Sequence, residues 1–439
     1  MGVGLKVAII GSGPAGMYTA GALNSKCPGC QIDILDKLAT PYGLIRTGVA
    51  PDHQTTKNVS RAFDKIMENE NVRFVGNIGF GSDISLTTLK SLYDVVVMAI
   101  GTPKDRELGV DGEDKSGVFG AQTFVYWYNG HPEFRDAVPH LDIKHAIVIG
   151  NGNVALDVAR VILSTEEEMI KSDLVDHAGK MIFKSPIETV RIIGRRGPEH
   201  AQFSTKELSE FGNLSTAVTY SDPTLIPDDF QSENAKETKV VNNNLKLLRG
   251  YSANKTDSTK RLLTLDFLLS PVAVLGDETM SGVRFELNRI EHGKAIGTGE
   301  YTDLPCDLLV TCIGYELKNV DGLPVEKGIV KNIDGRVEEG LYVVGWAKRG
   351  PSGTIGTNRL DSQAVVDRIV EDYCNGPDTT KEGADGLDDY CTANGIASVS
   401  FNDWKKINEA ELQRAGSESP RRKFVRKRDM LTLVHEETQ

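Results

Sequence analysis

The sequence predicts an α/β protein with two dinucleotide-binding domains of the Rossmann type, the second inserted in the first. An apolar strand, a glycine turn and an amphipathic helix occur twice, in VAIIGSGPAGMYTAGAL near the start and in VIGNGNVALDVAR at 148–160. Each unit is later followed by a buried strand that ends in glycine, DVVVMAIG and DLLVTCIG. Such strands are expected at the ligand edge of a doubly wound sheet. The expected domains are 1–104 with 331–439, and 105–330 between them.

Composition and charge narrow the class of protein. A chain of 439 residues has room for two or three domains. No apolar run is long enough for a membrane span, which leaves only peripheral membrane association. The net charge of −12 argues against nucleic acid as the main partner, because phosphates favour a basic surface. Nothing in the sequence demands an oligomer or a metal, so we expect a monomer without a metal site.

The first glycine turn predicts a site for an adenine dinucleotide. Its three glycines allow a tight turn, close approach of a pyrophosphate, and packing of the helix on the strand. A carboxylate at the end of the next strand would hold ribose hydroxyls, which fits FAD or NAD. The residues expected to contact this ligand are Gly11, Gly13, Pro14, Ala15, Gly16, Asp36 and Lys37.

The second turn has the G-x-G-x-x-A pattern and a different charge at the end of its next strand. Arg195 and Arg196 stand there in GRRG, and two guanidinium groups match a 2′-phosphate. The alternative is an ordinary surface arginine pair. We therefore predict FAD in the first site, NADP(H) in the second, and hydride transfer between them. The expected NADP contacts here are Gly150, Asn151, Gly152, Asn153, Val154, Arg195 and Arg196.

A third glycine-rich loop, GWAKRGPSGTIGTN, is expected to complete the flavin site. Gly353, Thr354 and Ile355 open a helix whose N–H groups and positive end would stabilise an anionic reduced flavin. Trp346 precedes this helix start and is expected to pack on the flavin or gate the nicotinamide, with plain core packing as the alternative.

One cysteine pair has the spacing of a redox dithiol. Cys27 and Cys30 form C-x-x-C. The pair falls where the first helix should lead into the second strand, away from the glycine turn. Cysteines are otherwise sparse, which suggests reduced thiols and an intracellular setting. We expect no catalytic dithiol.

With these motifs in place, the chain resembles adrenodoxin reductase and the bacterial NADPH–ferredoxin reductases of the two-Rossmann, glutathione-reductase-like type. The most specific stretches are PYGLIRTGVAPDH and KRGPSGTIGTN, and the C-terminal part is more similar to the bacterial branch. The stretches that carry the resemblance, in family order, are VAIIGSGPAGMYTA, PYGLIRTGVAPDH, WYNGHPEF, VIGNGNVALDVAR, IIGRRGP, FSTKEL and VVGWAKRGPSGTIGTN.

The resemblance implies further site residues. His53 and Glu207 look like the polar pair that lines the flavin–nicotinamide region, and we expect them to be catalytic; a simple loop histidine is the alternative for His53. Glu207 and Gly353 would also contact NADP. The flavin contacts that the resemblance adds or supports are Ala15, Asp36, Gly43, Leu44, His53, Phe80, Gly101, Trp346, Gly353, Thr354 and Ile355.

The resemblance also implies the reaction: hydride from NADPH to FAD, then single electrons to a [2Fe–2S] ferredoxin that serves cytochrome P450 or iron–sulfur cluster pathways. An acidic ferredoxin would need a basic patch, for which Lys348, Arg349 and the run 421–428 are candidates. Two residues depart from the family pattern. Asp36 replaces the usual Glu, and Ser209 stands where adrenodoxin-binding members carry an arginine.

Several alternatives stay open at this point. A flavin disulfide reductase would need a dithiol at the flavin, and a glutamate-synthase-like subunit would need cysteine clusters. A diaphorase with another acceptor or a redox-sensing nucleotide-binding module would keep both sites.

The compartment is expected to be the mitochondrial matrix in a eukaryote, otherwise the cytoplasm. Residues 221–258 are expected to be polar and loop-rich.

Overall fold

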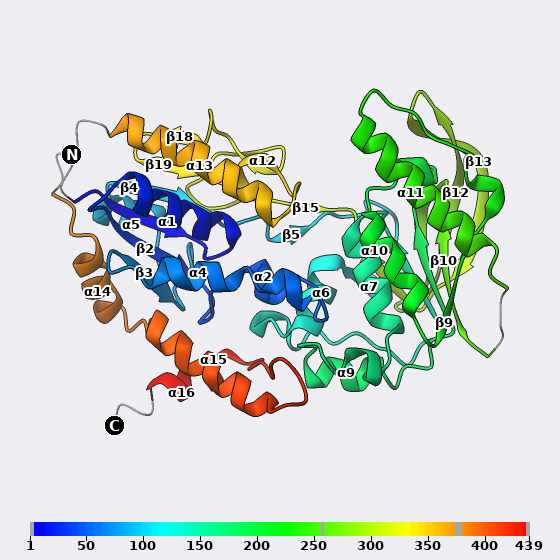
Figure 1. The fold of residues 1–439 in the computed structure, drawn as a ribbon, viewed down its shortest axis with the longest axis horizontal. Coiled ribbons are helices and arrows are strands. Elements are labelled where there is room, and N and C mark those ends of the chain that lie inside the picture. Colours follow the sequence, from blue (N-terminus) through cyan, green and yellow to red (C-terminus); the bar gives the residue numbers. More distant parts are fainter. Residues whose placement is uncertain (1–3, 256–258, 374–379, 436–439) are drawn as a thin grey trace. The chain divides into compact units, whose positions relative to one another are not determined.

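The computed structural model describes residues 4–255, 259–373 and 380–435. They divide into two compact units, which are shown in Figure 1. The first contains the described residues of 1–104, 129–133 and 315–439, and the second contains 105–128 and 134–314. The chain thus leaves the first unit and returns to it. Among the described residues, no helix combines the length and apolar character needed to cross a membrane.

The first unit is built on a seven-stranded sheet in which the strand order reverses at β1. The five inner strands are parallel, and the two outer strands pair antiparallel with their neighbours. In such sheets ligands bind at the carboxyl ends of the strands where the order reverses. The strands, in spatial order, are β18 (Arg336–Glu338), β19 (Leu341–Val343), β4 (Val95–Met98), β1 (Lys6–Ile10), β2 (Gln31–Asp36), β3 (Val72–Gly76) and β20 (Val399–Ser400).

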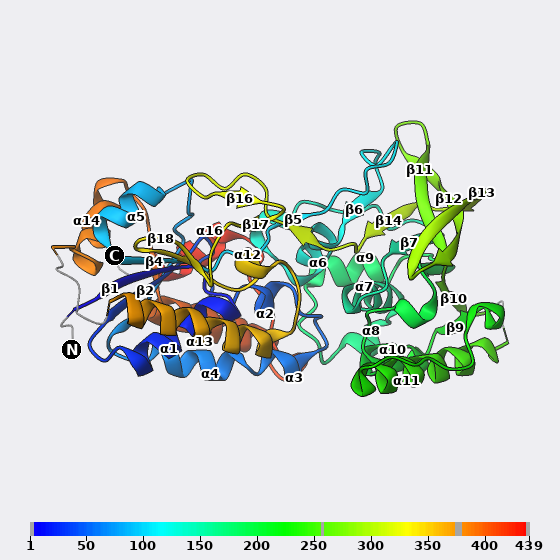
Figure 2. The same cartoon turned by 90° about the horizontal axis from the view of Figure 1, so that it is seen from above.

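Helices cover both faces of this sheet because successive strand residues point to opposite sides. Val7 and Ile9 of β1 belong to the core under α1 (Pro14–Lys26), α4 (Ser60–Met67) and α13 (Ile355–Asp372). Ala8 and Ile10 belong to the core under α5 (Leu86–Leu92) and α14 (Ala384–Ala393). Figure 2 shows α1, α13 and α4 together on one side of these strands. The unbroken apolar strand runs reflect this double burial.

The C-terminal segment is part of the first unit. It contains α15 (Phe401–Ala415) and α16 (Lys427–His435). Trp404 and Ile407 of α15 and Met430 and Val434 of α16 join the same core as α1 and α13.

The second unit combines a six-stranded parallel sheet with a three-stranded antiparallel one. Val283 and Phe285 of the antiparallel sheet share a core with Ile147, Ile149 and Leu309 of the parallel sheet. The parallel strands, in spatial order, are β6 (Val118–Gly120), β14 (Leu308–Thr311), β7 (His145–Ile149), β8 (Thr189–Ile193), β10 (Arg261–Asp266) and β9 (Ala217–Ser221). The antiparallel strands are β11 (Leu269–Gly276), β12 (Met280–Glu291) and β13 (Lys294–Pro305).

The segment 315–330, assigned to the inserted domain from the sequence, clusters with the first unit. It contains the short strands β15 (Tyr315–Glu316), β16 (Val325–Glu326) and β17 (Ile329–Val330). Leu317 and Val330 are fully buried in the core beneath α5 and α14, so this segment packs as part of the first unit. Residues 129–133 also join the first unit.

The expectation of a loop-rich region at 221–258 is wrong for residues 235–252, and residues 256–258 lie outside the described part of the chain. Helix α11 (Ala235–Ser252) lies there. The Asn234 side chain accepts hydrogen bonds from the backbone N–H groups of Lys236 and Glu237, a standard N-cap. Its buried residues include Val241, Leu245 and Leu248, which recur at helical spacing.

Candidate functional site

The first glycine turn has the shape of a phosphate-binding turn. Gly11 has φ of +111°, and a Cβ added there would lie 2.5 Å from Ala99 O. A Cβ added at Gly16 would lie 2.0 Å from Gly11 O, so glycine alone allows the helix to pack this closely. A Cβ added at Gly13, the N-cap of α1, would meet nothing within 4 Å. No side chain caps α1 and its first turn, which starts at Pro14, holds no acid, so its N–H groups can bind an anion.

Asp36 is held at the end of β2 by three hydrogen bonds. Its Oδ2 accepts Ser12 N–H at 2.9 Å and the Ser12 hydroxyl at 2.5 Å, and its Oδ1 accepts Leu38 N–H at 2.9 Å. Burial raises the pKa of Asp36, and these hydrogen bonds oppose that rise. A carboxylate has about four acceptor sites, so one remains for a ribose hydroxyl. The adjacent Lys37 pairs with Glu133 at 2.6 Å.

A second segment lies directly on this turn. A Cβ added at Gly43 would lie 3.0 Å from Gly13 Cα, and Gly43 has φ of +50°. Tyr42 N–H donates to Ser12 O at 3.1 Å. Leu44 then begins the short helix α2 (Leu44–Thr47). The structure therefore brings the predicted residues Gly43 and Leu44 to the first glycine turn.

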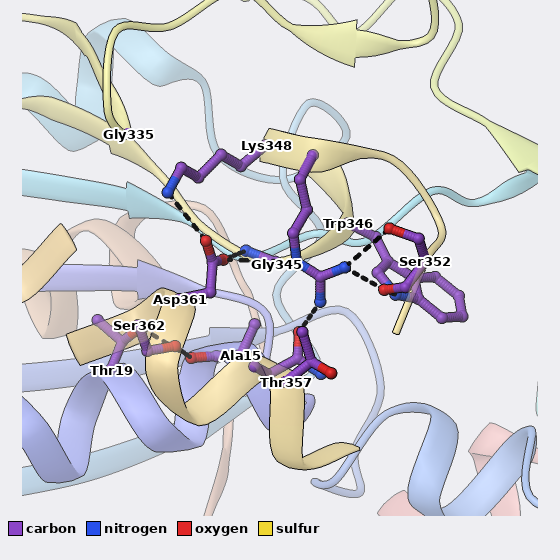
Figure 3. A network of polar contacts seen from close by, with 12 residues as sticks. Ala15, Thr19, Gly335, Gly345, Trp346, Lys348, Ser352, Thr357, Asp361 and Ser362 are labelled. Atoms are coloured by element: carbon purple, nitrogen blue, oxygen red, sulfur yellow. Dashed lines mark hydrogen bonds and ion pairs between the residues drawn. The ribbon is translucent and has the colours of Figure 1, made fainter. Parts of the chain in front are cut away.

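The third predicted segment, around Gly345, also reaches α1. A Cβ at Gly345 would lie 2.6 Å from Ala15 Cβ. Ser362 of α13 donates to Ala15 O at 3.0 Å. Asp361 accepts Gly345 N–H at 2.6 Å and the Lys348 ammonium at 2.9 Å, as Figure 3 shows. The sequence reasoning missed Asp361 and Ser362, although their position just after the glycine loop was visible.

Helix α13 begins beside this contact. Thr354 is its N-cap and exchanges hydrogen bonds with Thr357, and Ile355 is its first residue. Gly353 has φ of +83°, and an added Cβ would lie 2.7 Å from Thr357 Oγ1. Trp346, which begins α12 (Trp346–Arg349), stacks on Tyr315 with ring centroids 5.9 Å apart.

Lys348 and Arg349 do not form a free basic patch. Their side chains are 18% and 20% exposed. Lys348 pairs with Asp361, and Arg349 donates to Asn358 Oδ1 at 2.9 Å and to the Ser352 backbone oxygen. In place of the expected docking role, the two half-buried cations bind partners within the loop and on α13.

The remaining predicted residues occupy separate places. Gly101 follows β4 with φ of +66° and open space, and Phe80 is half-buried beside the core under α5. His53 is the half-buried N-cap residue of α3 (Gln54–Lys57) in the first unit. Glu207 lies in α10 (Thr205–Glu210) of the second unit, so its pairing with His53 stays a prediction.

The second glycine turn repeats the first one's geometry. Gly150 has φ of +134°, and an added Cβ would lie 2.3 Å from Cys312 O. Gly152 is the open N-cap of α7 (Asn153–Leu163), which no side chain caps and whose first turn, including Val154, holds no acid. Ala155 is fully buried, so a methyl group fits where the first turn requires glycine.

Two polar features of this turn suit a dinucleotide. The buried Oδ1 of Asn151 has no hydrogen-bond partner in the described part of the chain, and such atoms usually gain one from a ligand or water. Asn153 Oδ1 accepts Ser204 N–H at 2.8 Å. Arg195 is exposed and Arg196 half-buried, and neither guanidinium pairs with a described residue.

The C-x-x-C pair lies at the far end of α1. Cys27 caps the C-terminus of this thirteen-residue helix, which places it about 20 Å from the glycine turn at 1.5 Å per residue. Cys30 is fully buried, and burial raises the pKa of its thiol to about 12. An unionised, buried thiol is a poor redox nucleophile.

Comparisons with known proteins identify the family. Residues 5–194 match the model described as pyridine nucleotide-disulphide oxidoreductase. The chain is 39% identical to the mitochondrial NADPH:adrenodoxin oxidoreductase of Arabidopsis thaliana, covering 98% of this chain and 95% of that relative. It is 36% identical to the NADPH-ferredoxin reductase FprA of Mycobacterium tuberculosis, covering 98% of both. The chain belongs to the NADPH–ferredoxin and adrenodoxin reductase family.

The fold agrees with this family assignment. The structure of FprA from Mycobacterium tuberculosis in complex with NADPH superposes with a TM-score of 0.94 at 35% identity, covering 99% of both chains. The predicted resemblance and the two-Rossmann fold class are thereby confirmed. As a member of this reductase family, the protein is an oxidoreductase that uses FAD and NADP(H).

Proposed function

We propose that the protein transfers electrons from NADPH to a ferredoxin through bound FAD. The observation that carries this proposal is the contrast between its two glycine turns. The first is followed by the carboxylate of Asp36, which suits ribose hydroxyls, and the second by Arg195 and Arg196, which suit a 2′-phosphate. A bound flavin converts a two-electron hydride donor into a source of single electrons.

The first unit supplies the groups that would hold FAD. The uncapped start of α1 at Gly13 would bind the pyrophosphate, and Asp36 would accept a hydrogen bond from a ribose hydroxyl. The start of α13, at Thr354 and Ile355, offers backbone N–H groups and a positive helix end to the pyrimidine side of the ring. Asp361 keeps this helix start beside Ala15 through Gly345.

The second unit supplies the groups that would hold NADPH. The uncapped start of α7 would bind its pyrophosphate, and Asn151 Oδ1 would accept a hydrogen bond from a donor group of the nucleotide. Arg195 and Arg196 bind the 2′-phosphate. His53 and Glu207 would be the polar pair of the flavin–nicotinamide region that the family resemblance implies.

We further propose a [2Fe–2S] ferredoxin as acceptor, serving cytochrome P450 or iron–sulfur cluster pathways. The compartment would be the mitochondrial matrix in a eukaryote or the cytoplasm in a bacterium. Ser209, where an arginine is common in adrenodoxin-binding members, is exposed and donates to Lys206 O at 2.6 Å. Because Ser209 carries no charge, we expect an acceptor that makes fewer ionic contacts with α10 than adrenodoxin makes with its reductase.

The test is ferredoxin-dependent reduction of cytochrome c by the purified yellow protein, with NADPH and NADH compared side by side. A rate that requires the [2Fe–2S] ferredoxin and strongly prefers NADPH is the expected result. Fast flavin reduction by NADPH without any ferredoxin-dependent rate would overturn the acceptor and keep the two cofactors. A protein purified without flavin, and unable to take it up, would overturn the whole proposal.

A further inference from the structure

A buried cluster of charges joins the C-terminal segment to α2 within the first unit. Glu411 of α15 is fully buried. Arg46 of α2 binds it with both terminal nitrogens of its guanidinium group, at 2.9 and 2.5 Å. Arg421 binds the same carboxylate at 2.8 Å. Phe424 N–H also donates to it at 2.8 Å. All the donors thus converge on one carboxylate.

Glu411 is the only negative charge bound by this pair of arginines in the described part of the chain. Burial by itself would raise the pKa of Glu411, but Arg46 and Arg421 hold it below its ordinary value. The carboxylate is therefore ionised at neutral pH. Its removal would leave the guanidinium of Arg46, which is 7% exposed, without the carboxylate that binds it, and would leave Arg421 only its longer-range interaction with Asp64.

The same cluster is linked to Tyr42 through Trp404. The guanidinium of Arg46 lies 5.2 Å from the Trp404 ring centre, and that of Arg421 lies 5.9 Å from it. Trp404 Nε1–H donates to the Tyr42 hydroxyl at 3.2 Å, and that hydroxyl donates to Asp64.

Tyr42 belongs to a strained turn that rests on the first glycine turn. Tyr42 and Gly43 have φ of +85° and +50°, and a bulky residue rarely adopts this conformation unless its surroundings hold it. Tyr42 N–H donates to Ser12 O, and Gly43 lies against Gly13. Because Gly13 caps the helix that binds pyrophosphate, a shift of this turn would disturb the dinucleotide site.

Lys423 connects the C-terminal segment to α2 at a further point. Its ammonium, on a residue 5% exposed, donates to Arg46 O and Asn129 O, each at 3.1 Å. Arg421 and Lys423 therefore serve the interior of the first unit. The expectation that the whole run 421–428 offers a docking patch is corrected for these two residues, whereas Lys427 and Arg428 are exposed.

We propose that Glu411 is a positioning residue for the flavin. Through Arg46 and through Trp404, it holds the turn Tyr42–Leu44 against the first glycine turn, so the C-terminal segment controls how tightly FAD is retained. This inference rests on the proposed function, because it takes FAD as the ligand of that turn.

The experiment compares FAD release from the full-length holoenzyme and its variants. Glu411→Gln keeps the side-chain volume and removes the charge, and Glu411→Asp keeps the charge. Glu418→Gln is the matched control, because Glu418 lies on the same segment, is 71% exposed and pairs only with Arg422 among the described residues. Released FAD is measured by its fluorescence after dilution, and the visible circular dichroism of bound FAD reports its surroundings.

We expect Glu411→Gln to release FAD on the order of ten-fold faster and to change the visible circular dichroism, because the buried Arg46 and the half-buried Arg421 lose the carboxylate that binds them both. Glu411→Asp should restore part of the retention, and Glu418→Gln should match the wild type. A general loss of structure would instead appear in the far-ultraviolet spectrum. If Glu411→Gln releases FAD at the wild-type rate and its visible circular dichroism is unchanged, the inference is overturned and the proposed function is not. A wild-type protein that holds no FAD would overturn the proposed function.

Should Glu411→Gln fail to fold, Tyr42→Phe tests the same link. It removes the hydroxyl between Trp404 and Asp64 and leaves the charge cluster intact. We expect several-fold faster release of FAD. Release at the wild-type rate from Tyr42→Phe would overturn the inference.

Discussion

The carboxylate of Asp361 accepts the backbone N–H of Gly345 at 2.6 Å and ties the glycine loop to helix α13. The other carboxylate oxygen accepts the Lys348 ammonium at 2.9 Å (Figure 3). One side chain, 10% exposed, thus ties both ends of α12 to α13, and Gly345 at the start of α12 lies beside Ala15.

Replacing this carboxylate should loosen the loop. We expect Asp361→Asn to lower the free energy of unfolding by about 1–3 kcal/mol, the usual effect of losing charged hydrogen bonds at a buried site. The rate of flavin reduction by NADPH should fall as well. The control is Asp367→Asn on the same helix, whose pair with Lys26 is 62% exposed on the aspartate side and should matter little. Equal effects of both changes, in thermal unfolding and stopped-flow reduction, would contradict this role.

The arginine pair should decide the choice of nicotinamide cofactor. Replacing Arg195 and Arg196 together by alanine should raise KM for NADPH by about a hundred-fold or more, since each charged hydrogen bond contributes about 1.5–3 kcal/mol and each arginine supplies at least one. KM for NADH should change little, because NADH has no 2′-phosphate. Arg289→Ala, in an exposed ion pair with Glu291 of the same unit, is the control. A parallel rise in both KM values would show that the pair does not read the phosphate.

His131 should make the first unit sensitive to acid. The residue is 3% exposed; burial, then the nearby Lys37, lower its pKa from 6.5 to about 4, although Glu133 opposes this. Between these pH values the folded protein binds fewer protons than the unfolded chain, so stability falls as the pH falls. The full shift corresponds to about 3 kcal/mol.

We therefore expect the stability of His131→Gln to fall less than that of the wild type between pH 6.5 and 4. Urea unfolding at several pH values measures it, and His140→Gln, at an exposed position, is the control. If His131→Gln and the wild type lose stability in parallel over this range, His131 does not contribute.

The C-x-x-C pair should be dispensable for turnover. Replacing Cys27 and Cys30 together by alanine should leave ferredoxin-dependent turnover near the wild-type rate, because the pair lies at the end of α1 remote from the glycine turn. A stability loss of about 1–2 kcal/mol is expected from the cavity at the buried Cys30. Loss of turnover with FAD still bound would instead favour the disulfide-reductase alternative.

Local patterns were sufficient to predict the two nucleotide turns. Gly11 and Gly150 need left-handed backbone, and Gly16 needs the absence of a side chain, and these requirements act over a few residues. The charge contrast between Asp36 and Arg195 is local in the same way. A polar helix such as α11 was missed because its buried stripe is narrow and its surface is charged.

The closing contacts of the site join residues far apart in the chain, and sequence patterns do not encode such distances. Asp361 meets Gly345 beside Ala15, and Glu411 meets Arg46, only because the sheet and its helices bring the two ends of the chain together. The sequence alone predicted the family and both nucleotide turns, since each depends on neighbouring residues. Tertiary packing decided which cations bind partners inside the protein, because Lys423 is buried and Lys348 and Arg421 are half-buried, and their partners are not visible in any local pattern.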